Sequence, residues 1–381
     1  MPAPQPLAVL VTSEAWQSAL ACIQSLGRRG HRVYLLALDS PSLHASSQFV
    51  AGVARYPRVP TLDGFAEAVF RLAEANGIDL VVPISDDDAL IAARINELFP
   101  AASRPSAPRF VTGGGEATRL VRSRNRTIEL CRELGIRTPR TEFTDLAGLA
   151  SACEKIGFPC FLKVSGTIAS QGVIPLHSDA EIGPAAAMLP ADSELQVQEP
   201  IYGDFVDAAG YCRSGRVVAA FAFRAAYDMS SGGTPAHATL CDDSRVLRVL
   251  DALAGALQWT GGIDVDLLAT PDGGYAVLEI NPRLSGTVIF GQKRGLDLAA
   301  GYLPGEESLV SPDLPGLDRN ATGFVSLAEE ARFIARGGEA ARERAARFRR
   351  EYRCVDNAFS DDPGYSEALT RQIERIQPRA R

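Results

Sequence analysis

A carboxylate, an amide and a guanidinium alternate along one short segment of the chain. In Glu279-Ile280-Asn281-Pro282-Arg283 these polar side chains stand two residues apart, directly after a strand-like alternation that begins at Tyr275. Side chains two apart in a strand point to the same face. Carboxylate and amide oxygens are ligands that Mg²⁺ prefers, and a guanidinium beside them can hold a phosphate or a carboxylate through two hydrogen bonds. The segment therefore predicts a metal and phosphate site.

A second acidic segment precedes this one. Residues 261–267 read as a strand that carries Asp264 and Asp266 on one face, and the turn Pro271-Asp272-Gly273-Gly274 joins it to the first strand as a hairpin. A carboxylate from this strand opposite Glu279 would complete a set of two acids and one amide. The alternative interpretation is that Asp264 and Asp266 form the solvated face of an edge strand.

Lysine is rare in this chain, and one lysine ends a strand. Lys155, Lys163 and Lys293 are the only lysines, while arginine supplies the other cations, so a retained lysine suggests a need for lysine chemistry. Lys155 reads as solvated surface. Lys163 lies in a short apolar strand, and the small-residue loop 165–172 that follows offers backbone N–H groups to phosphates. The loop lacks the order of a Walker motif.

The segment 195–204 combines a strand with an acidic, hinge-like end. The strand ends at Glu199-Pro200, and Gly203-Asp204 follows. Backbone groups there can read a flat base edge, and Asp204 can accept hydrogen bonds from sugar hydroxyls. A plain hairpin turn is the alternative.

Two kinds of architecture must position these residues. Strands and helices alternate through residues 7–98, which predicts a parallel, doubly wound sheet, and a Pro/Ala/Ser-rich link follows at 99–108. From about residue 160 short strands dominate, which predicts an α+β lobe with antiparallel pairing. Segment 303–323 is Pro/Gly-rich and reads as a loop, and 338–353 reads as a charged, exposed helix. The expected units are 1–110, 111–190, 191–302 and a C-terminal extension, 303–381.

Composition excludes several classes of protein. The net charge of −7 over 381 residues argues against a general nucleic-acid binder. No apolar run approaches the ~20 residues of a membrane helix, and no signal peptide is apparent. Seven scattered cysteines without a C-x-x-C pair fit a reducing compartment, so a cytoplasmic protein is expected. The four histidines have no metal-ligand spacing.

The order of these motifs resembles the ATP-grasp superfamily. A strand lysine, a Gly-bounded loop, an acidic hinge, an acidic strand and E-x-N-P-R follow one another within residues 110–300, and E-I-N-P-R after an acidic strand is the most specific part. The preceding α/β lobe resembles the pre-ATP-grasp domain. The resemblance implies a Rossmann-like parallel α/β domain, then a single two-lobed ATP-grasp unit with antiparallel sheets.

The resemblance also implies a nucleotide site. Arg124 opens a helix where the family commonly has a lysine, and Lys163 resembles the lysine that contacts the α- and β-phosphates. The other residues implied to bind ATP are the loop over the triphosphate, the adenine-reading hinge and the ribose acid, namely Ser170, Gln171, Gly172, Glu199, Ile201 and Asp204.

Metal, catalytic and substrate roles follow in the same way. Asp266, Glu279 and Asn281 resemble the ligands of Mg²⁺ (or Mn²⁺), and Arg283 resembles the arginine near the γ-phosphate, so Arg283 and Lys163 are the expected catalytic residues. Arg224, Arg283, Ser285 and Gly286 are candidate substrate contacts. The alternatives are a surface hairpin at Arg224 and a simple helix-start turn at 285–287. His237 reads as incidental, and the run Asp86-Asp87-Asp88 as a helix cap.

The expected function is a carboxylate–amine ligase of the ADP-forming type. Mg²⁺-ATP would phosphorylate a substrate carboxylate, and an amine would attack the acyl phosphate. The expected partners are an amine and a small carboxylic acid, for which an amino acid in a biosynthetic pathway is the preferred class, with no nucleic acid and no membrane. Many members of the superfamily dimerise, so a homodimer is expected. A kinase of the same fold, or a nucleotide-binding regulator without turnover, are the alternatives.

Overall fold

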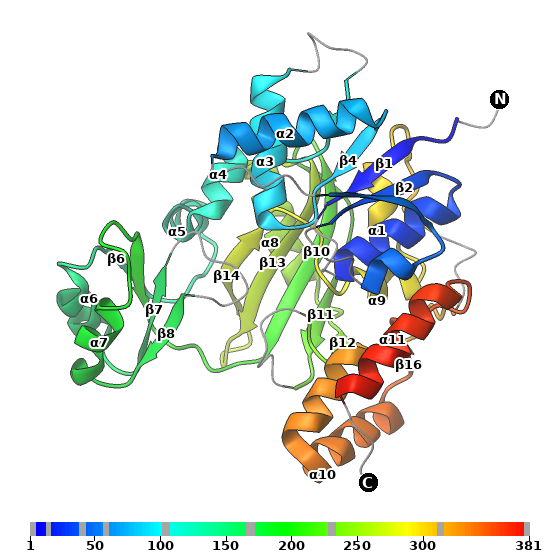
Figure 1. Ribbon diagram of the computed structural model, residues 1–381. Coiled ribbons are helices and arrows are strands. Elements are labelled where there is room, and N and C mark those ends of the chain that lie inside the picture. The colour runs from blue at the N-terminus through cyan, green and yellow to red at the C-terminus, as the bar shows by residue number, and fades with distance from the viewer. Residues whose placement is uncertain are drawn as a thin grey trace.

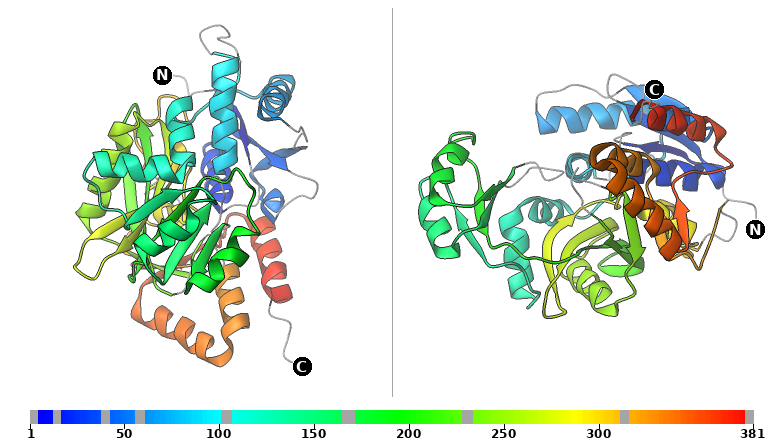
Figure 2. Two further views of the ribbon diagram at one scale, coloured as in Figure 1. Left: turned by 90° about the vertical axis from the view of Figure 1, so that its left-hand side faces the viewer. Right: turned by 90° about the horizontal axis from the view of Figure 1, so that it is seen from below.

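Three β-sheets organise the chain in the computed structural model, which describes residues 5–12, 17–37, 43–55, 61–100, 107–164, 172–227, 234–310 and 316–376. The four-stranded sheet and its helices stand to one side of the other two sheets (Figure 2, right). In the part of the chain that the structure describes, no helix is both long and apolar enough to cross a membrane.

The N-terminal sheet is parallel and covered on both faces. Its strand order is β3-β2-β1-β4-β5 (Figure 1). The strands are β1 (Ala8–Val11), β2 (Arg32–Ala37), β3 (Val50–Arg55), β4 (Leu80–Val82) and β5 (Arg109–Phe110), and the helices are α1 (Gln17–Arg28), α2 (Leu62–Ala75) and α3 (Asp86–Leu98). Val9 and Val11 of β1 pack toward α1, whereas Ala8 and Leu10 pack toward α2 and α3. The predicted Rossmann-like domain is confirmed.

The four-stranded sheet is antiparallel and covered on one face. Its order is β6-β9-β7-β8, with β6 (Thr141–Thr144), β7 (Cys160–Val164), β8 (Val173–Leu176) and β9 (Leu195–Gln198). Helices α6 (Leu149–Ile156) and α7 (Ile182–Ala186) bury Leu162 and Val197 of this sheet. Because side chains alternate along a strand, Lys163 points to the opposite face, which no helix of this cluster covers.

The largest sheet supplies the floor of the site. Its order is β14-β13-β10-β11-β12-β15-β16, and of these described pairs only β15–β16 is parallel. The strands are β10 (Phe205–Arg213), β11 (Arg216–Ala225), β12 (His237–Leu240), β13 (Gly261–Ala269), β14 (Tyr275–Asn281), β15 (Gly323–Val325) and β16 (Cys354–Asp356). Helices α4 (Gly115–Arg122), α5 (Arg124–Glu133) and α8 (Ser244–Ala256) pack on one face, and α9 (Val288–Lys293) and a 3-10 helix (Leu298–Tyr302) pack on the other. Strand β14 is the edge nearest the four-stranded sheet (Figure 1).

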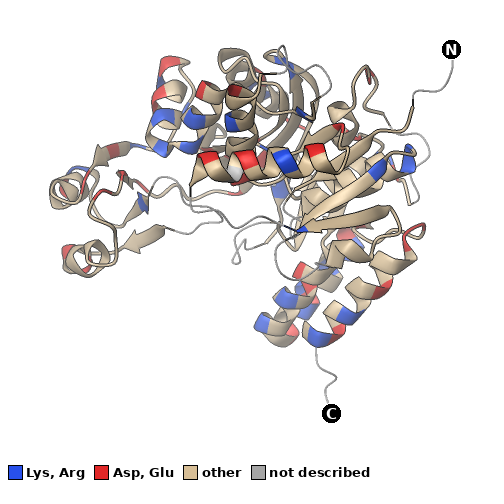
Figure 3. Cartoon of the chain, turned by 45° about the horizontal axis from the view of Figure 1, so that its top comes forward, with Lys and Arg blue, Asp and Glu red and all other residues tan. Residues whose placement is uncertain are grey.

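The C-terminal segment extends this sheet and returns to the N-terminal domain. Strands β15 and β16 belong to it, and α11 (Pro363–Ile376) buries Tyr365 and Leu369 in the core that also holds α1. Asp362 accepts hydrogen bonds from Gln24 and Ser47 of the N-terminal domain. The predicted charged helix is part of α10 (Leu327–Glu351), which bends at Gly338 and carries both signs of charge (Figure 3).

Candidate active site

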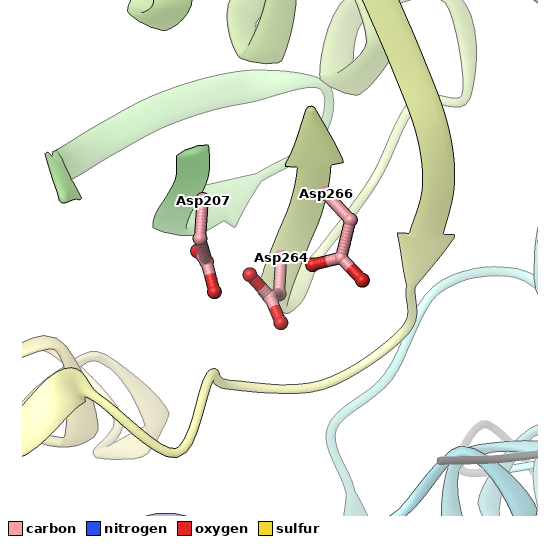
Figure 4. Close-up of side chains that lie close together, drawn as sticks. All are labelled: Asp207, Asp264 and Asp266. Atoms are coloured by element: carbon pink, nitrogen blue, oxygen red, sulfur yellow. The ribbon is translucent and has the colours of Figure 1, made fainter. Parts of the chain in front are cut away.

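Three adjacent strands present polar side chains to one face of the largest sheet. The register places Asp207 of β10 beside Asp266 of β13, and Asp266 beside Glu279 of β14. One step along, Asp264 lies beside Asn281. Their neighbours in sequence point to the other face, where Val206, Val265 and Ile280 are buried under α8. The predicted position of a β13 carboxylate opposite Glu279 is confirmed, and Figure 4 shows the three aspartates converging.

These residues line a cavity of about 360 Å³ between the sheets. The four-stranded sheet contributes one wall, the segment after β9 contributes Glu199 and Ile201, and the N-terminal domain contributes Asp86. The remaining polar residues along the cavity are Arg124, Lys163, Gln198, Asp207, Thr234, Asp264, Asp266, Glu279, Asn281, Arg283, Ser285 and Thr287. The cavity is therefore built from both lobes and from the N-terminal domain.

Two cations lie near Glu279, one from the four-stranded sheet and one from the start of α5. Lys163 lies on β7, and burial together with the charge of Arg124 lowers the pKa of its ammonium group from 10.5 to about 8. Arg124 is the first residue of α5, which Ser123 caps by accepting a hydrogen bond from the Arg126 N–H. The buried Arg124 guanidinium donates to the Val164 carbonyl, and its Nη2 lies 3.5 Å from Glu279 Oε1. Arg124 thus connects the two lobes at the site.

Arg283 lies between the carboxylates of Asp86 and Asp264 in the cavity. Its Nη1 donates to Asp264 Oδ2, and its Nε lies 3.3 Å from Asp86 Oδ1 at the start of α3. Burial opposes the charged form, but the carboxylates of Asp86, Asp264 and Asp266 raise the pKa of Arg283 above its usual value. The guanidinium is therefore fixed in place and fully charged.

Asp207 is a functional candidate that sequence reasoning missed, and Asp264 was grouped with Asp266 on the acidic strand without a role of its own. Burial, and then the charge of Asp264, raise the pKa of Asp207 well above its usual value. The Ser285 hydroxyl donates to Asp207 Oδ2 over 2.9 Å, while Oδ1 of Asp207 and Oδ1 of Asp264 have no hydrogen-bond partner within the described residues. The available signal was a lone carboxylate inside the apolar segment 205–209.

Asp86 was predicted only as part of a helix cap, but it also lines the cavity. The helix cap is formed by Ser85 and Asp88, which exchange two hydrogen bonds. Asp86 instead lines the cavity beside Arg283 and lies 3.4 Å from Arg122 Nη1.

The acids and the amide offer a suitable donor set for a hard cation. Asp266 and Glu279 face each other across neighbouring strands, and burial together with the charges of Asp264 and Glu279 raises the pKa of Asp266. The Asn281 amide donates from Nδ2 to Asp264 Oδ2 over 3.4 Å, which leaves its carbonyl oxygen for a cation. Asp207, Asp264 and Asp266 also bring ligand oxygens within 4.8 Å of one another. The oxygen-only chemistry of both groups fits Mg²⁺ or Mn²⁺.

The other predicted nucleotide residues are only partly brought together. Glu199 accepts a hydrogen bond from the Arg140 N–H over 2.8 Å, and its side chain and Ile201 line the cavity. Gly172 has φ +70° and accepts from the Val164 N–H, whereas Ser170 and Gln171 lie outside the described residues.

Two predicted residues lie away from the cavity. Asp204 and Arg224 form an ion pair of 2.7 Å and line a separate, shallow groove with Tyr202 and Tyr275. Neither is among the residues along the main cavity. In this structure, then, the predicted ribose acid and one candidate substrate contact bind each other.

Ser285 and Gly286, by contrast, lie along the cavity wall. A Cβ at Gly286 would lie 2.2 Å from Thr234 Oγ1, so a larger residue at this position would displace the Thr234 side chain. His237 is buried outside the cavity and bonds to Glu330 over 2.9 Å, as expected of an incidental histidine.

Solved structures share this architecture. N5-carboxyaminoimidazole ribonucleotide synthetase in complex with ADP matches with a TM-score of 0.65 at 18% identity, over 88% of this chain and 86% of that chain. L-amino acid ligase from Bacillus licheniformis matches with a TM-score of 0.63 at 15% identity, over 85% and 80%. The biotin carboxylase domain of Hydrogenobacter thermophilus 2-oxoglutarate carboxylase, with MgADP, ADP and bicarbonate, matches with a TM-score of 0.63 at 16% identity, over 81% and 72%.

No protein-family model matches the chain, and no curated protein matches it. At these identities the structural likeness shows the fold. The chain has the ATP-grasp fold with a preceding parallel α/β domain, as the order of its motifs predicted.

Proposed function

We propose that this protein is an ADP-forming, Mg²⁺-ATP-dependent carboxylate–amine ligase. The observation that carries the proposal is the row Asp266–Glu279 with Asn281 beside it, facing Lys163 and Arg124 across one cavity. The three similar structures support it, since two are named as a synthetase and a ligase and two hold ADP.

The proposed reaction has two steps. A substrate carboxylate oxygen attacks the γ-phosphorus of ATP, the bond to the β-phosphate oxygen breaks, and ADP leaves. An amine then attacks the acyl phosphate, phosphate leaves, and the amine nitrogen loses a proton as the C–N bond forms. The protein needs no covalent nucleophile for either step.

The described residues have distinct tasks in this reaction. Mg²⁺ held by Asp266, Glu279 and Asn281 would neutralise charge on the phosphates. Lys163 places an ammonium group at the phosphate side, and Arg283, fixed by Asp86 and Asp264, directs a guanidinium at the transferring phosphoryl group or the carboxylate. Glu199 and Ile201, which line the cavity, would contact the adenine, as the resemblance implies.

The test measures ADP release from Mg²⁺-ATP with pools of amino acids and other carboxylates, with hydroxylamine as the trapping amine. We expect carboxylate-dependent ADP together with a hydroxamate, and loss of both in Glu279→Gln. ADP without hydroxamate or any amide product would favour a kinase. ATP binding with no ADP from any pool would contradict the proposal and favour a regulator.

Self-association is a separate expectation. The similar biotin carboxylase domain of Hydrogenobacter thermophilus was solved as a dimer. We propose that this chain is also a homodimer, which sedimentation of the full chain tests.

A further inference from the structure

The cavity carries more carboxylates than the expected metal site uses. Asp266 and Glu279 belong to that site, whereas Asp207 and Asp264 lie on the side of the cavity away from Lys163. Asp207 lies on β10, two strands in from the edge strand β14 that is next to the four-stranded sheet, and Asp264 lies on β13 in contact with Arg283. The exposed fractions of Asp207 and Asp264 are only 4% and 2%.

In each of these two carboxylates, Oδ2 accepts hydrogen bonds from neighbouring side chains, whereas Oδ1 does not. Asp207 Oδ2 accepts from Ser285, and Asp264 Oδ2 accepts from Arg283 and Asn281. Oδ1 of each residue accepts no hydrogen bond from a described N–H or O–H group, and the two carboxylates lie within hydrogen-bonding reach of each other, so either a shared proton or a positive ligand from the cavity can satisfy them. Figure 4 shows the two carboxylates side by side. Buried carboxylate oxygens require donors or a positive charge.

The surroundings favour an ammonium group as that partner. Around Asp207 the cavity is walled by Phe223, which is its register partner on β11, and by Thr234 and Thr287. Among the described residues, Arg283 is the cation on the same side of the cavity as Asp207 and Asp264. Its guanidinium already donates to Asp264 Oδ2. A primary ammonium offers three donors, and it can therefore satisfy both free oxygens together.

Arg283 then fixes the relation of this subsite to the reacting group. This step rests on the proposed function, in which Arg283 binds the substrate carboxylate. Because Arg283 donates a hydrogen bond to Asp264, that carboxylate would lie next to the subsite formed by Asp207 and Asp264. An α-amino acid carries its ammonium and its carboxylate on one carbon, so one small molecule fits both positions.

We propose that Asp207 and Asp264 bind the α-ammonium group of the substrate, and that the acid activated by this protein is an α-amino acid. The subsite selects amino acids over the corresponding acids that lack the amino group. Ser285 is a positioning residue here, since it holds Asp207 through its second oxygen.

The first experiment compares matched substrates. ADP release with Mg²⁺-ATP and hydroxylamine is measured for each standard amino acid and for its des-amino counterpart, using the full chain and Asp207→Asn. In the wild type we expect one or a few amino acids to be used and their des-amino counterparts to be poor substrates. In Asp207→Asn we expect KM for the amino acid to rise roughly 10- to 100-fold, the range for losing a charge-assisted hydrogen bond. KM for ATP and the Mg²⁺ dependence stay within about twofold of the wild-type values.

Asp251→Asn is the matched control, because Asp251 is exposed on α8 at the opposite face of the sheet. An unchanged KM in Asp207→Asn would overturn the proposal and indicate a proton shared by the two carboxylates. A shifted Mg²⁺ requirement with unchanged amino-acid preference would also overturn it, since Asp207 would then be a metal ligand.

A binding measurement separates this proposal from the proposed function. Thermal unfolding of the wild type and of Asp207→Asn is followed with Mg²⁺ and a non-hydrolysable ATP analogue, with and without each amino acid. Stabilisation of the wild type that Asp207→Asn loses supports the subsite even if ADP release is never seen, in which case only the ligase function fails. No stabilisation and no ADP release with any amino acid would overturn the subsite itself.

Discussion

Replacing Lys163 by methionine should change stability and activity in opposite directions. Methionine keeps an unbranched chain of similar length and removes the ammonium group, which the charge of Arg124 repels. We expect Lys163→Met to be more stable than the wild type in the absence of ligand, because the folded state no longer holds this charge in a half-buried place.

The magnitude follows from the depressed pKa. A fall from 10.5 to about 8 corresponds to about 3 kcal/mol at about 1.36 kcal/mol for each pH unit. Water reaches part of the side chain and screens its charge, so we expect a gain of about 1 to 3 kcal/mol in the free energy of unfolding. Below pH 8 both the folded and the unfolded state hold the proton, and the full gain is present. It declines as the pH rises from 8 to 10.5, where the folded wild type has already lost the proton.

Catalysis should respond in the other direction. Removing one preorganised donor from a phosphoryl-transfer site lowers kcat by about 10²- to 10³-fold. Mg²⁺ with a non-hydrolysable ATP analogue should also stabilise the wild type more than the variant, because the ammonium group then faces phosphate instead of Arg124.

Urea unfolding at pH 7 and pH 10, with and without the analogue, together with ADP release, measures all three effects. Lys155→Met serves as the control, since Lys155 is exposed and pairs only with Glu142 among the described residues. A Lys163→Met protein that is no more stable than the wild type at pH 7, or that retains near-full activity, would refute the reasoning.

Three further predictions concern single residues. Glu279→Gln should lower ADP release by at least ~100-fold and raise the Mg²⁺ concentration needed for half-maximal rate, because it removes one of two carboxylates facing each other; a normal Mg²⁺ titration would speak against a metal role. Asp204→Ala should change KM for ATP less than about threefold, because exposed Asp204 pairs with Arg224 outside the cavity; a larger rise would show that Asp204 turns to the ribose when ATP binds. Burial opposes ionisation of Glu330, but hydrogen bonds from His237 and Arg349 lower its pKa below 4.5, so Glu330→Gln should cost about 1 kcal/mol at pH 7 in urea unfolding. That difference should vanish as the pH falls below the lowered pKa, and an equal cost at all pH values would refute the electrostatic origin.

The β13–β14 hairpin was predictable because its determinants are local. Alternation assigned Asp264, Asp266, Glu279 and Asn281 to one face, and the Asp-Gly-Gly turn fixed which residues stand opposite each other. A β-bulge after Asp266 leaves this pairing intact. Alternation along β7 also explains why Lys163 lies on the face opposite to Leu162, which helices α6 and α7 bury.

Residues whose neighbours come from distant segments were not predictable in this way. Asp207 meets Asp266 only because β10, more than 50 residues earlier, is the next strand in the sheet, and no turn in the sequence fixes that pairing. Asp86 contacts Arg283 across the boundary between domains. Strands β15 and β16 have three residues each, too few for an alternating pattern to be read.

The misassigned acids share one physical cause. A carboxylate in sequence is equally compatible with a helix cap, a solvated strand face and a buried site, and only packing distinguishes these environments. Asp86 and Asp88 belong to the same first turn of α3, yet Asp88 bonds to its own helix while Asp86 faces the cavity. Asp204 and Asp207 are three residues apart, yet one is exposed beside Arg224 and the other is buried.

The charged residues of the cavity suggest that its ligands bind cooperatively. Among the described residues, six carboxylates line it, at Asp86, Glu199, Asp207, Asp264, Asp266 and Glu279, against three cations, at Arg124, Lys163 and Arg283. Burial and neighbouring carboxylates raise the pKa of Asp207 and of Asp266, so this excess of acidic groups becomes fully ionised only when positive ligands bind there. A divalent cation at Asp266 and Glu279 and an ammonium group at Asp207 and Asp264 would offset that excess, while the phosphates would meet Lys163 and Arg124. Each ligand thereby makes the cavity more favourable for the next, so ATP, metal and amino acid should bind more tightly together than alone.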